Sequence, residues 1–142
     1  MMYKKILAAL ENSPADQSLL PHIEKLAQTL HSQVLLVHVA EGWAARSYND
    51  LYLKESEEMV QDRNYLEERA EELRAKGIET ATYLALGEPA AEILNTAARE
   101  KCDLIAMTSH GHRFLADLFL GSTIEEVRHQ SSIPILVVKW VH

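Results

Sequence analysis

The stretch that decides the fold is "DLIAMTSHGHRFLADLFLGSTIEEV", residues 103–127. It opens with an apolar run, 103–109, whose length and composition suit a buried strand. Gly111 and Gly121 follow, and the residues after the second glycine, 122–130, have the pattern of a short helix. Many proteins hold a phosphate group with a strand, a glycine-containing loop and a helix in this order, because the free N–H groups at a helix start attract anions.

The loop does not match either common phosphate-binding pattern. It has no lysine, whereas the Walker pattern needs Gly-Lys-Ser/Thr with the amine on the phosphates, and it is not a GxGxxG sequence. Ser122 and Thr123 offer hydroxyl donors at the expected helix start. A glycine turn before a helix also occurs without a ligand, so the residues alone leave both a phosphate site and a plain turn open.

The rest of the chain alternates strand and helix patterns. Apolar runs predict further strands at 4–10, 33–40, 78–86 and 133–141. Helical spacing predicts one helix that starts near Ser13, Pro14 and Asp16, and others at 51–76, 87–101 and 122–130. Gly77 is expected to end the second of these helices, and residues 41–50, which show no period, are expected to form a loop.

This alternation predicts an α/β fold in one domain over residues 1–142, with a parallel sheet covered by helices on both faces. Ligands of such sheets bind beyond the carboxyl ends of the strands, where the strand order reverses. In a 2-1-3-type order or a 3-2-1-4-5 order, we place that point between the first and fourth strands. The stretches "ENS" (11–13) and "MTSHG" (107–111) end these two strands and are expected on the same side of the sheet.

Composition excludes several function classes. The chain has 142 residues, 47% of them apolar, with 14 basic and 21 acidic side chains and a formal charge of −7. No basic stripe exists to neutralise phosphates, so a nucleic-acid partner is not expected. The opening "MMYKKILAAL" is too short to span a membrane and lacks a small-residue cleavage site, so we expect no membrane insertion.

Cys102 is the only cysteine. A disulfide framework is therefore excluded, and a cytoplasmic location is expected. Cys102 directly precedes a predicted buried strand, so we expect a buried structural thiol and not a nucleophile.

The glycine loop resembles the nucleotide loop of the universal stress protein family, in which G-x-x-G is followed by nine residues and G-S/T. Here the pattern reads Thr108, Ser109, His110 and Gly111, then nine residues, then Gly121 and Ser122. The likeness covers nearly the whole chain. Its other segments are "YKKILAALENSPADQSLL" (3–20), "VLLVHVAE" (34–41), "ALGEPAAEILNTAAREKCDLIAMTSHG" (85–111) and "GSTIEEVRHQSSIPILVVK" (121–139).

The resemblance implies an open five-stranded parallel sheet of order 3-2-1-4-5, the Rossmann-type adenine nucleotide alpha hydrolase-like fold. It implies that ATP or AMP binds at the ends of strands one and four, in a nucleotide-responsive stress regulator. Where Mg²⁺ accompanies the nucleotide, we expect the phosphates to hold most of it. It assigns nucleotide binding to Glu11, Val39, Met107, Thr108, His110, Gly111, Gly121, Ser122 and Thr123.

Three residues depart from the family's pattern. Glu11 replaces the usual aspartate and is one methylene longer, and Asn12 follows where glycine is common. Thr108 replaces the first loop glycine, so its side chain either crowds the phosphate path or donates a hydroxyl to it. These departures support an alternative, a dimeric stress or adaptor protein of the same fold that binds no nucleotide.

The resemblance also implies a homodimer through the C-terminal strand, 133–141. An apolar strand at a sheet edge tends to aggregate if bare, and pairing with its copy across a two-fold axis covers that edge. Trp140 is expected at this interface, with a partly exposed end cap as the alternative.

The chain shows no equipment for efficient catalysis. Ser109 and His110 are adjacent, and consecutive strand side chains point to opposite faces, so they are not expected to pair. The loop offers Arg113 but no lysine to stabilise a transferring phosphoryl group. His110 and His112 lack neighbouring acids for a metal site. An efficient ATPase or kinase is therefore not expected, whereas slow ATP hydrolysis is compatible with the sequence.

Overall fold

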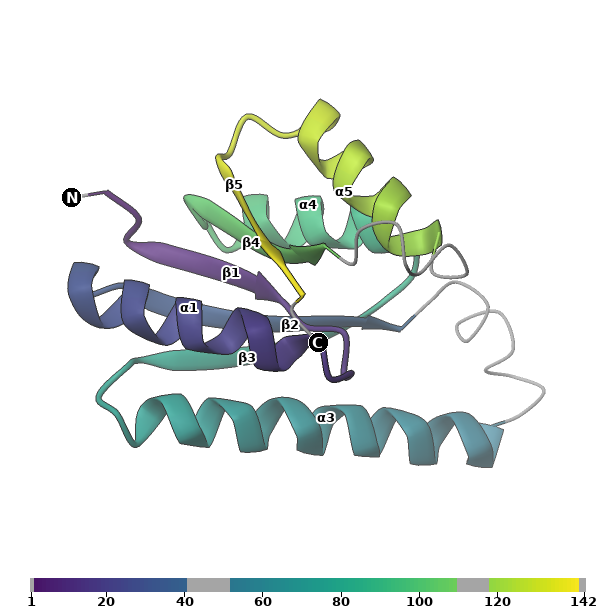
Figure 1. Cartoon of the computed structure of the whole chain (residues 1–142). Coiled ribbons are helices and arrows are strands. Elements are labelled where there is room, and N and C mark those ends of the chain that lie inside the picture. The colour runs from purple at the N-terminus through teal and green to yellow at the C-terminus, as the bar shows by residue number, and fades with distance from the viewer. Residues whose placement is uncertain (1, 41–51, 110–117, 141–142) are drawn as a thin grey trace.

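A computed structural model describes residues 2–40, 52–109 and 118–140 of the chain (Figure 1). Strands and helices alternate along these residues. The elements are β1 (Lys5–Ala9), α1 (Asp16–Leu30), β2 (Gln33–Ala40), α3 (Tyr52–Arg74), β3 (Thr80–Leu86), α4 (Pro89–Arg99), β4 (Leu104–Ser109), α5 (Leu118–Gln130) and β5 (Ile135–Lys139).

The strands form one five-stranded sheet of order β3-β2-β1-β4-β5, and every neighbouring pair is parallel. Helices α1 and α3 lie on one face of this sheet, and α4 and α5 lie on the other (Figure 1). The predicted α/β fold with a 3-2-1-4-5 order is therefore confirmed. Strand β1 sits in the middle because its short apolar sequence is buried from both faces.

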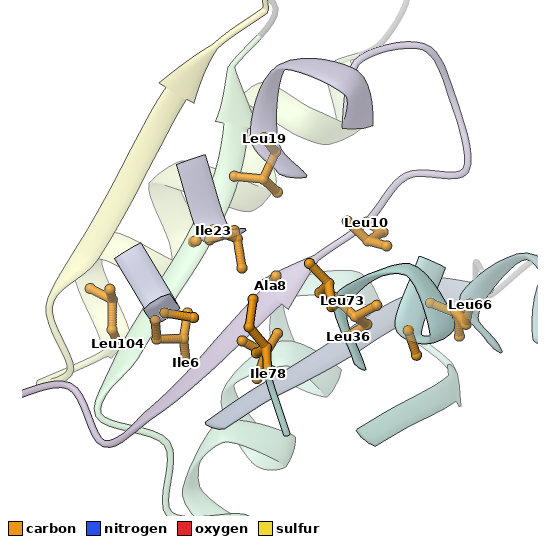
Figure 2. Packing of buried hydrophobic residues seen from close by; sticks show 14 of the residues in the cluster. Ile6, Ala8, Leu10, Leu19, Ile23, Leu36, Leu66, Leu73, Ile78 and Leu104 are labelled. Atoms are coloured by element: carbon orange, nitrogen blue, oxygen red, sulfur yellow. The ribbon is translucent and has the colours of Figure 1, made fainter. Parts of the chain in front are cut away.

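Alternate residues of the central strands build two cores. Ile6 and Ala8 of β1 pack toward α1 and α3, where they meet Ile23 and Leu73 (Figure 2). Fully burying an aliphatic side chain of this size contributes about 1.5–3 kcal/mol, so this layer is a main source of stability.

The second core lies on the opposite face. Leu7 of β1 and Ile105 of β4 pack there with Ile93 of α4 and Val127 of α5. All four side chains are buried, so the sheet is covered on both faces at its centre.

Two predicted helix starts need comment. The first helix begins near the predicted residues, at Asp16, but its N-cap position is Ala15 and has no side-chain cap bond. Ser13 Oγ instead accepts a hydrogen bond from the N–H of Ala15 at 3.3 Å, in the tight turn that precedes α1. The second is wrong. The helix expected over 122–130 begins four residues earlier, at Leu118.

Strand β2 has the predicted bounds, and the other described boundaries differ from the predicted ones by a few residues. Helix α3 ends at Arg74, and Gly77, with φ +83°, follows in the left-handed region that allows the chain to turn toward β3. The predicted loop over 41–50 lies outside the described residues.

Candidate functional site

The sheet divides at its carboxyl edge between β1 and β4. Their paired residues run only as far as Ala8 and Ala106. Beyond this point β1 stays with β2, because the N–H of Leu10 donates to the carbonyl of Val37 at 2.7 Å. Strand β4 stays with β5 as far as Ser109. This β1–β4 split coincides with the switch point at which ligands of such sheets bind.

Thr108 lines the split on the β4 side. It pairs with Val138 of β5 and, by strand alternation from Leu104 and Ala106, faces α1. The side chain is only 2% exposed, and among the described residues its Oγ1 finds no hydrogen-bond partner. A buried hydroxyl without a partner costs about 1–3 kcal/mol. A group that formed a hydrogen bond with this hydroxyl would remove that cost.

Asp16 fixes the turn on the β1 side of the split. Its carboxylate is 1% exposed and accepts hydrogen bonds from the N–H groups of Glu11 and Asn12, both at 2.9 Å. The same carboxylate accepts the hydroxyl of Tyr65 in α3 at 2.6 Å. The turn after β1 is thus held by an internal anion, and these two amides are not available to a bound phosphate.

Glu11 follows β1 directly and is partly buried. Its Oε1 accepts the hydroxyl of Ser13 at 3.2 Å, while its own N–H is held by Asp16. The backbone at Glu11 is therefore fixed, directly after the strand that forms one side of the split. A carboxylate there can accept hydrogen bonds from ligand hydroxyls and repels phosphate.

A second polar group joins the ends of β1 and β2 to α3. Asp62 Oδ1 accepts from the side-chain amide of Asn12 at 2.8 Å, and its Oδ2 lies 3.6 Å from His38 Nε2. His38 Nδ1 lies 2.9 Å from the carbonyl oxygen of Leu10, which can only accept. The Nδ1 atom therefore carries a proton and donates a hydrogen bond to this carbonyl.

Val39 and Met107 lie together on the other face. Both side chains are buried in the core beneath α4 and α5, near the carboxyl ends of β2 and β4. They therefore face away from Thr108, and a ligand must lie across the sheet edge to contact both sides.

The predicted residues of the glycine loop are only partly placed. His110 and Gly111 lie outside the described residues. Gly121, Ser122 and Thr123 lie inside α5, and the Thr123 side chain is buried. Because a helix leaves only its first four amides free, a helix that begins at Leu118 engages the amides of Ser122 and Thr123. The amides of these two residues are thus used within α5, and the contacts of Gly121, Ser122 and Thr123 with a nucleotide stay a prediction.

Residues 2–139 match the sequence model of the universal stress protein family. The chain belongs to this family. A universal stress protein of Methanocaldococcus jannaschii is 31% identical, with 98% of this chain and 96% of that protein covered. A universal stress protein of Bacillus subtilis is 28% identical over 97% of this chain and all of its own length. The solved structure of the archaeal protein superimposes with a TM-score of 0.83 at 30% identity, covering 100% of this chain and 99% of that one.

These likenesses fix the fold of this universal stress protein. A solved family member from Lactobacillus plantarum gives a TM-score of 0.82 at 19% identity, covering 97% and 99% of the two chains. The fold is thus the adenine nucleotide alpha hydrolase-like arrangement that the sequence predicted.

Two further observations concern the residues that the structure describes. The described residues contain no group of three or more histidine, cysteine or carboxylate side chains arranged to hold a metal ion. None of the helices that the structure describes has the length and apolarity that a membrane crossing requires.

Cys102 is buried, as predicted. Burial raises the pKa of the Cys102 thiol to about 11, and the adjacent Lys5 only partly offsets this. The thiol is therefore protonated at neutral pH and is a poor nucleophile.

The sequence alone missed the residues that hold the turn after β1. Asp16 was assigned only to the start of a helix, and Tyr65, His38 and Asp62 were not singled out. Asp16 and Tyr65 are separated by 49 positions, so no local pattern connects them.

Proposed function

We propose that this universal stress protein, acting as one domain over 1–142, binds ATP or AMP in the β1–β4 split. It serves in the cytoplasm as a nucleotide-responsive stress regulator and not as a metabolic enzyme. The observation that carries this proposal is the buried, unpartnered hydroxyl of Thr108 beside a split at the topological switch point. A protein that used this edge only as a turn would gain stability from an apolar residue there.

The polar groups of the protein suggest where the ribose and the phosphates of the proposed ligand lie. Glu11 suits the ribose, because its carboxylate accepts hydroxyl hydrogen bonds and repels phosphates. Asp16 occupies the amides after β1, so the phosphates are directed toward β4 and α5. There the proposed contacts come from Thr108, His110, Gly111, Gly121, Ser122 and Thr123.

The adenine end is proposed to lie near Val39 and Met107, whose positions end β2 and β4. Mg²⁺, where it accompanies ATP, is held mostly by phosphate oxygens, which are the hard ligands it prefers. We assign no metal ligand to the protein.

Solved proteins of the same fold support an adenine nucleotide. One is a universal stress protein in complex with cAMP, at 17% identity and a TM-score of 0.72. Another, from Archaeoglobus fulgidus, is in complex with dAMP, at 21% identity and a TM-score of 0.72. At this identity the two complexes support only that the fold can bind an adenine nucleotide. The proposed contacts in this protein are argued from its own residues.

We further propose a homodimer through β5. This strand lies at one edge of the sheet, and its Val137 is 44% exposed. The opposite edge, β3, is partly covered, because Arg74 Nε donates to the carbonyl of Thr80 at 2.9 Å. An exposed apolar edge strand is stabilised by pairing with its copy.

Calorimetric titration with ATP and with AMP tests the nucleotide proposal. We expect binding heat, a raised melting temperature, and ATP turnover well below roughly one per second, the low end for typical enzymes. The absence of both heat and a thermal shift at millimolar ATP would contradict binding and favour the adaptor alternative. Steady turnover above that rate would contradict the regulator assignment.

A further inference from the structure

The free edge of β5 has a defined set of outward-facing backbone groups. The N–H of Trp140 donates to Ser109, and the carbonyl of Pro134 accepts from Ile105, so even-numbered residues direct their backbone groups to β4. In a parallel pair the alternate residues face away from the neighbour. The N–H and C=O groups of Ile135, Val137 and Lys139 therefore point out of the sheet.

This set selects one register for a two-fold pairing of β5 with its copy. In an antiparallel pair, outward-facing residues oppose one another and exchange both hydrogen bonds. Centring the axis on Val137 pairs all the outward residues: Val137 with Val137 of the partner subunit, and Ile135 with Lys139 of the partner subunit. Centring it on Leu136 or Val138 leaves an outward residue unpaired at an end, so the register centred on Val137 makes the most bonds.

The same register fixes the position of Trp140. Leu136 and Val138 pack on the core beneath α1, and alternation places Trp140, whose N–H continues the pairing with β4, on that same face. Directly opposed residues of an antiparallel pair share a face and lie about 4.5–5.5 Å apart. Trp140 of the partner subunit is thus opposite Pro134, on the α1 side of the sheet.

An apolar groove of about 520 Å³ lies at that point, between α1 and the start of β5. Leu26 and Leu30 of α1 form one side, and Pro134 and Leu136 form the other. An indole ring is large and mostly apolar, with a single N–H donor, and contributes most when it enters such a groove. Lys25 also lines the groove, and its ammonium can interact with the face of an aromatic ring.

We propose that Trp140 of the partner subunit fills this α1–β5 groove, so that two reciprocal tryptophans anchor the dimer. The inference rests on the homodimer proposed above and is independent of nucleotide binding. In this arrangement the groove is filled by a side chain from a second copy of this chain. Helix α1 then contributes to the interface together with β5.

Cysteine cross-linking tests the register. Val137→Cys brings two thiols into a directly opposed pair about 5.5 Å apart at Cα, within the range of a disulfide. Under mild oxidation we expect a cross-linked dimer from this variant and little from Leu136→Cys or Val138→Cys. Cross-linking at either of the latter instead of Val137→Cys would overturn the register and with it the docking of Trp140. The native Cys102 is buried and adds no background.

Sedimentation equilibrium tests the groove contact. We expect Trp140→Ala to raise the dimer dissociation constant roughly 30-fold or more, as for a tryptophan buried in a pocket of an interface. Val60→Ala is the matched control, since it removes an exposed apolar side chain, 51% exposed on α3, far from β5 in the fold. The control should leave the constant unchanged.

The outcomes separate the two proposals. Efficient cross-linking of Val137→Cys together with an unchanged dissociation constant for Trp140→Ala would overturn the groove contact alone. A monomeric wild-type chain, together with a Val137→Cys variant that fails to cross-link, would overturn the homodimer as well. Since Trp43 is the only other tryptophan, Trp43→Phe isolates the Trp140 emission, which should shift to shorter wavelength on dimerisation. An ATP titration of Trp140→Ala reports nucleotide binding separately.

Discussion

Tyr65 of α3 donates a 2.6 Å hydrogen bond to the buried carboxylate of Asp16, at the start of α1. This contact ties the long helix to the turn that presents Glu11 to the split. Burial and the bond to Asp16 raise the pKa of the Tyr65 hydroxyl well above its usual value, so the hydroxyl stays protonated and donates. The carboxylate in turn holds the two amides that follow β1.

Removing this hydroxyl should destabilise the fold measurably. Tyr65→Phe leaves a buried anion short of one donor, and we expect a loss of about 1.5–3 kcal/mol in the free energy of unfolding. Urea denaturation measures it. Tyr83→Phe is a suitable control, because the Tyr83 ring stacks with Arg99 at 4.8 Å and that contact survives loss of the hydroxyl. Equal effects from both changes would argue against a special role for the Asp16–Tyr65 bond.

Thr108 should show opposite effects on stability and on binding. Thr108→Val removes an unpartnered buried hydroxyl and keeps the branched shape, so the ligand-free protein should be equally or more stable. The same change should weaken ATP binding about tenfold or more if the hydroxyl contacts a phosphate. Thr108→Ser keeps the hydroxyl and should retain binding. Full ATP affinity in the Thr108→Val variant would remove this residue from the proposed site.

The two described glycines with positive φ should differ in their tolerance of a side chain. At Gly77, with φ +83°, an added Cβ has nothing within 4 Å, so Gly77→Ala should cost only the backbone strain, about 1 kcal/mol. At Gly87, with φ +142°, the Cβ would meet Glu92 Cγ at 3.2 Å. Gly87→Ala should therefore cost more, about 2–3 kcal/mol by chemical denaturation. The reverse ranking would show that the Glu92 side chain yields freely.

Cys102 should make stability depend on alkaline pH. Its folded-state pKa of about 11 lies above the ordinary thiol value of 9.0, so the unfolded chain loses the thiol proton first as pH rises. The stabilisation is complete below about pH 9 and is lost progressively toward pH 11, amounting to on the order of 2 kcal/mol.

The Cys102→Ala variant supplies the comparison for this prediction. The difference in unfolding free energy between wild type and variant should shrink as the pH is raised from 8 to 11. Labelling of the native thiol at neutral pH should also be slow until the protein is unfolded. Rapid labelling of the folded protein would contradict the buried, protonated thiol.

The sheet could be predicted because its signals are local. The run 33–40 is apolar except for Gln33 and His38 and coincides with β2 to the residue. The start of α5 was missed because the nine residues between Gly111 and Gly121 were assigned to the loop. One signal for the earlier start was present: Asp117, a residue type favoured before a helix, directly precedes Leu118.

The candidate site could be predicted only in outline. Strand order places the ends of β1 and β4 side by side, and the sequence predicted that much. The hydrogen bonds of Asp16 and Asp62 join segments far apart in the chain, so they follow from tertiary packing and leave no spacing to recognise. The burial of Thr108 likewise depends on three neighbouring elements and could not be decided from its identity.

Because β1 separates from β4 at the carboxyl edge, the two halves of the sheet are attached to different elements there. The β1 half is tied through Asp16 and Asp62 to α3, and the β4 half is tied through Ser109 to β5, the strand of the proposed dimer. A ligand that contacts both halves therefore connects α3 with β5. By thermodynamic reciprocity, any change it makes in the affinity of one subunit for another is matched by an equal change in its own affinity on assembly.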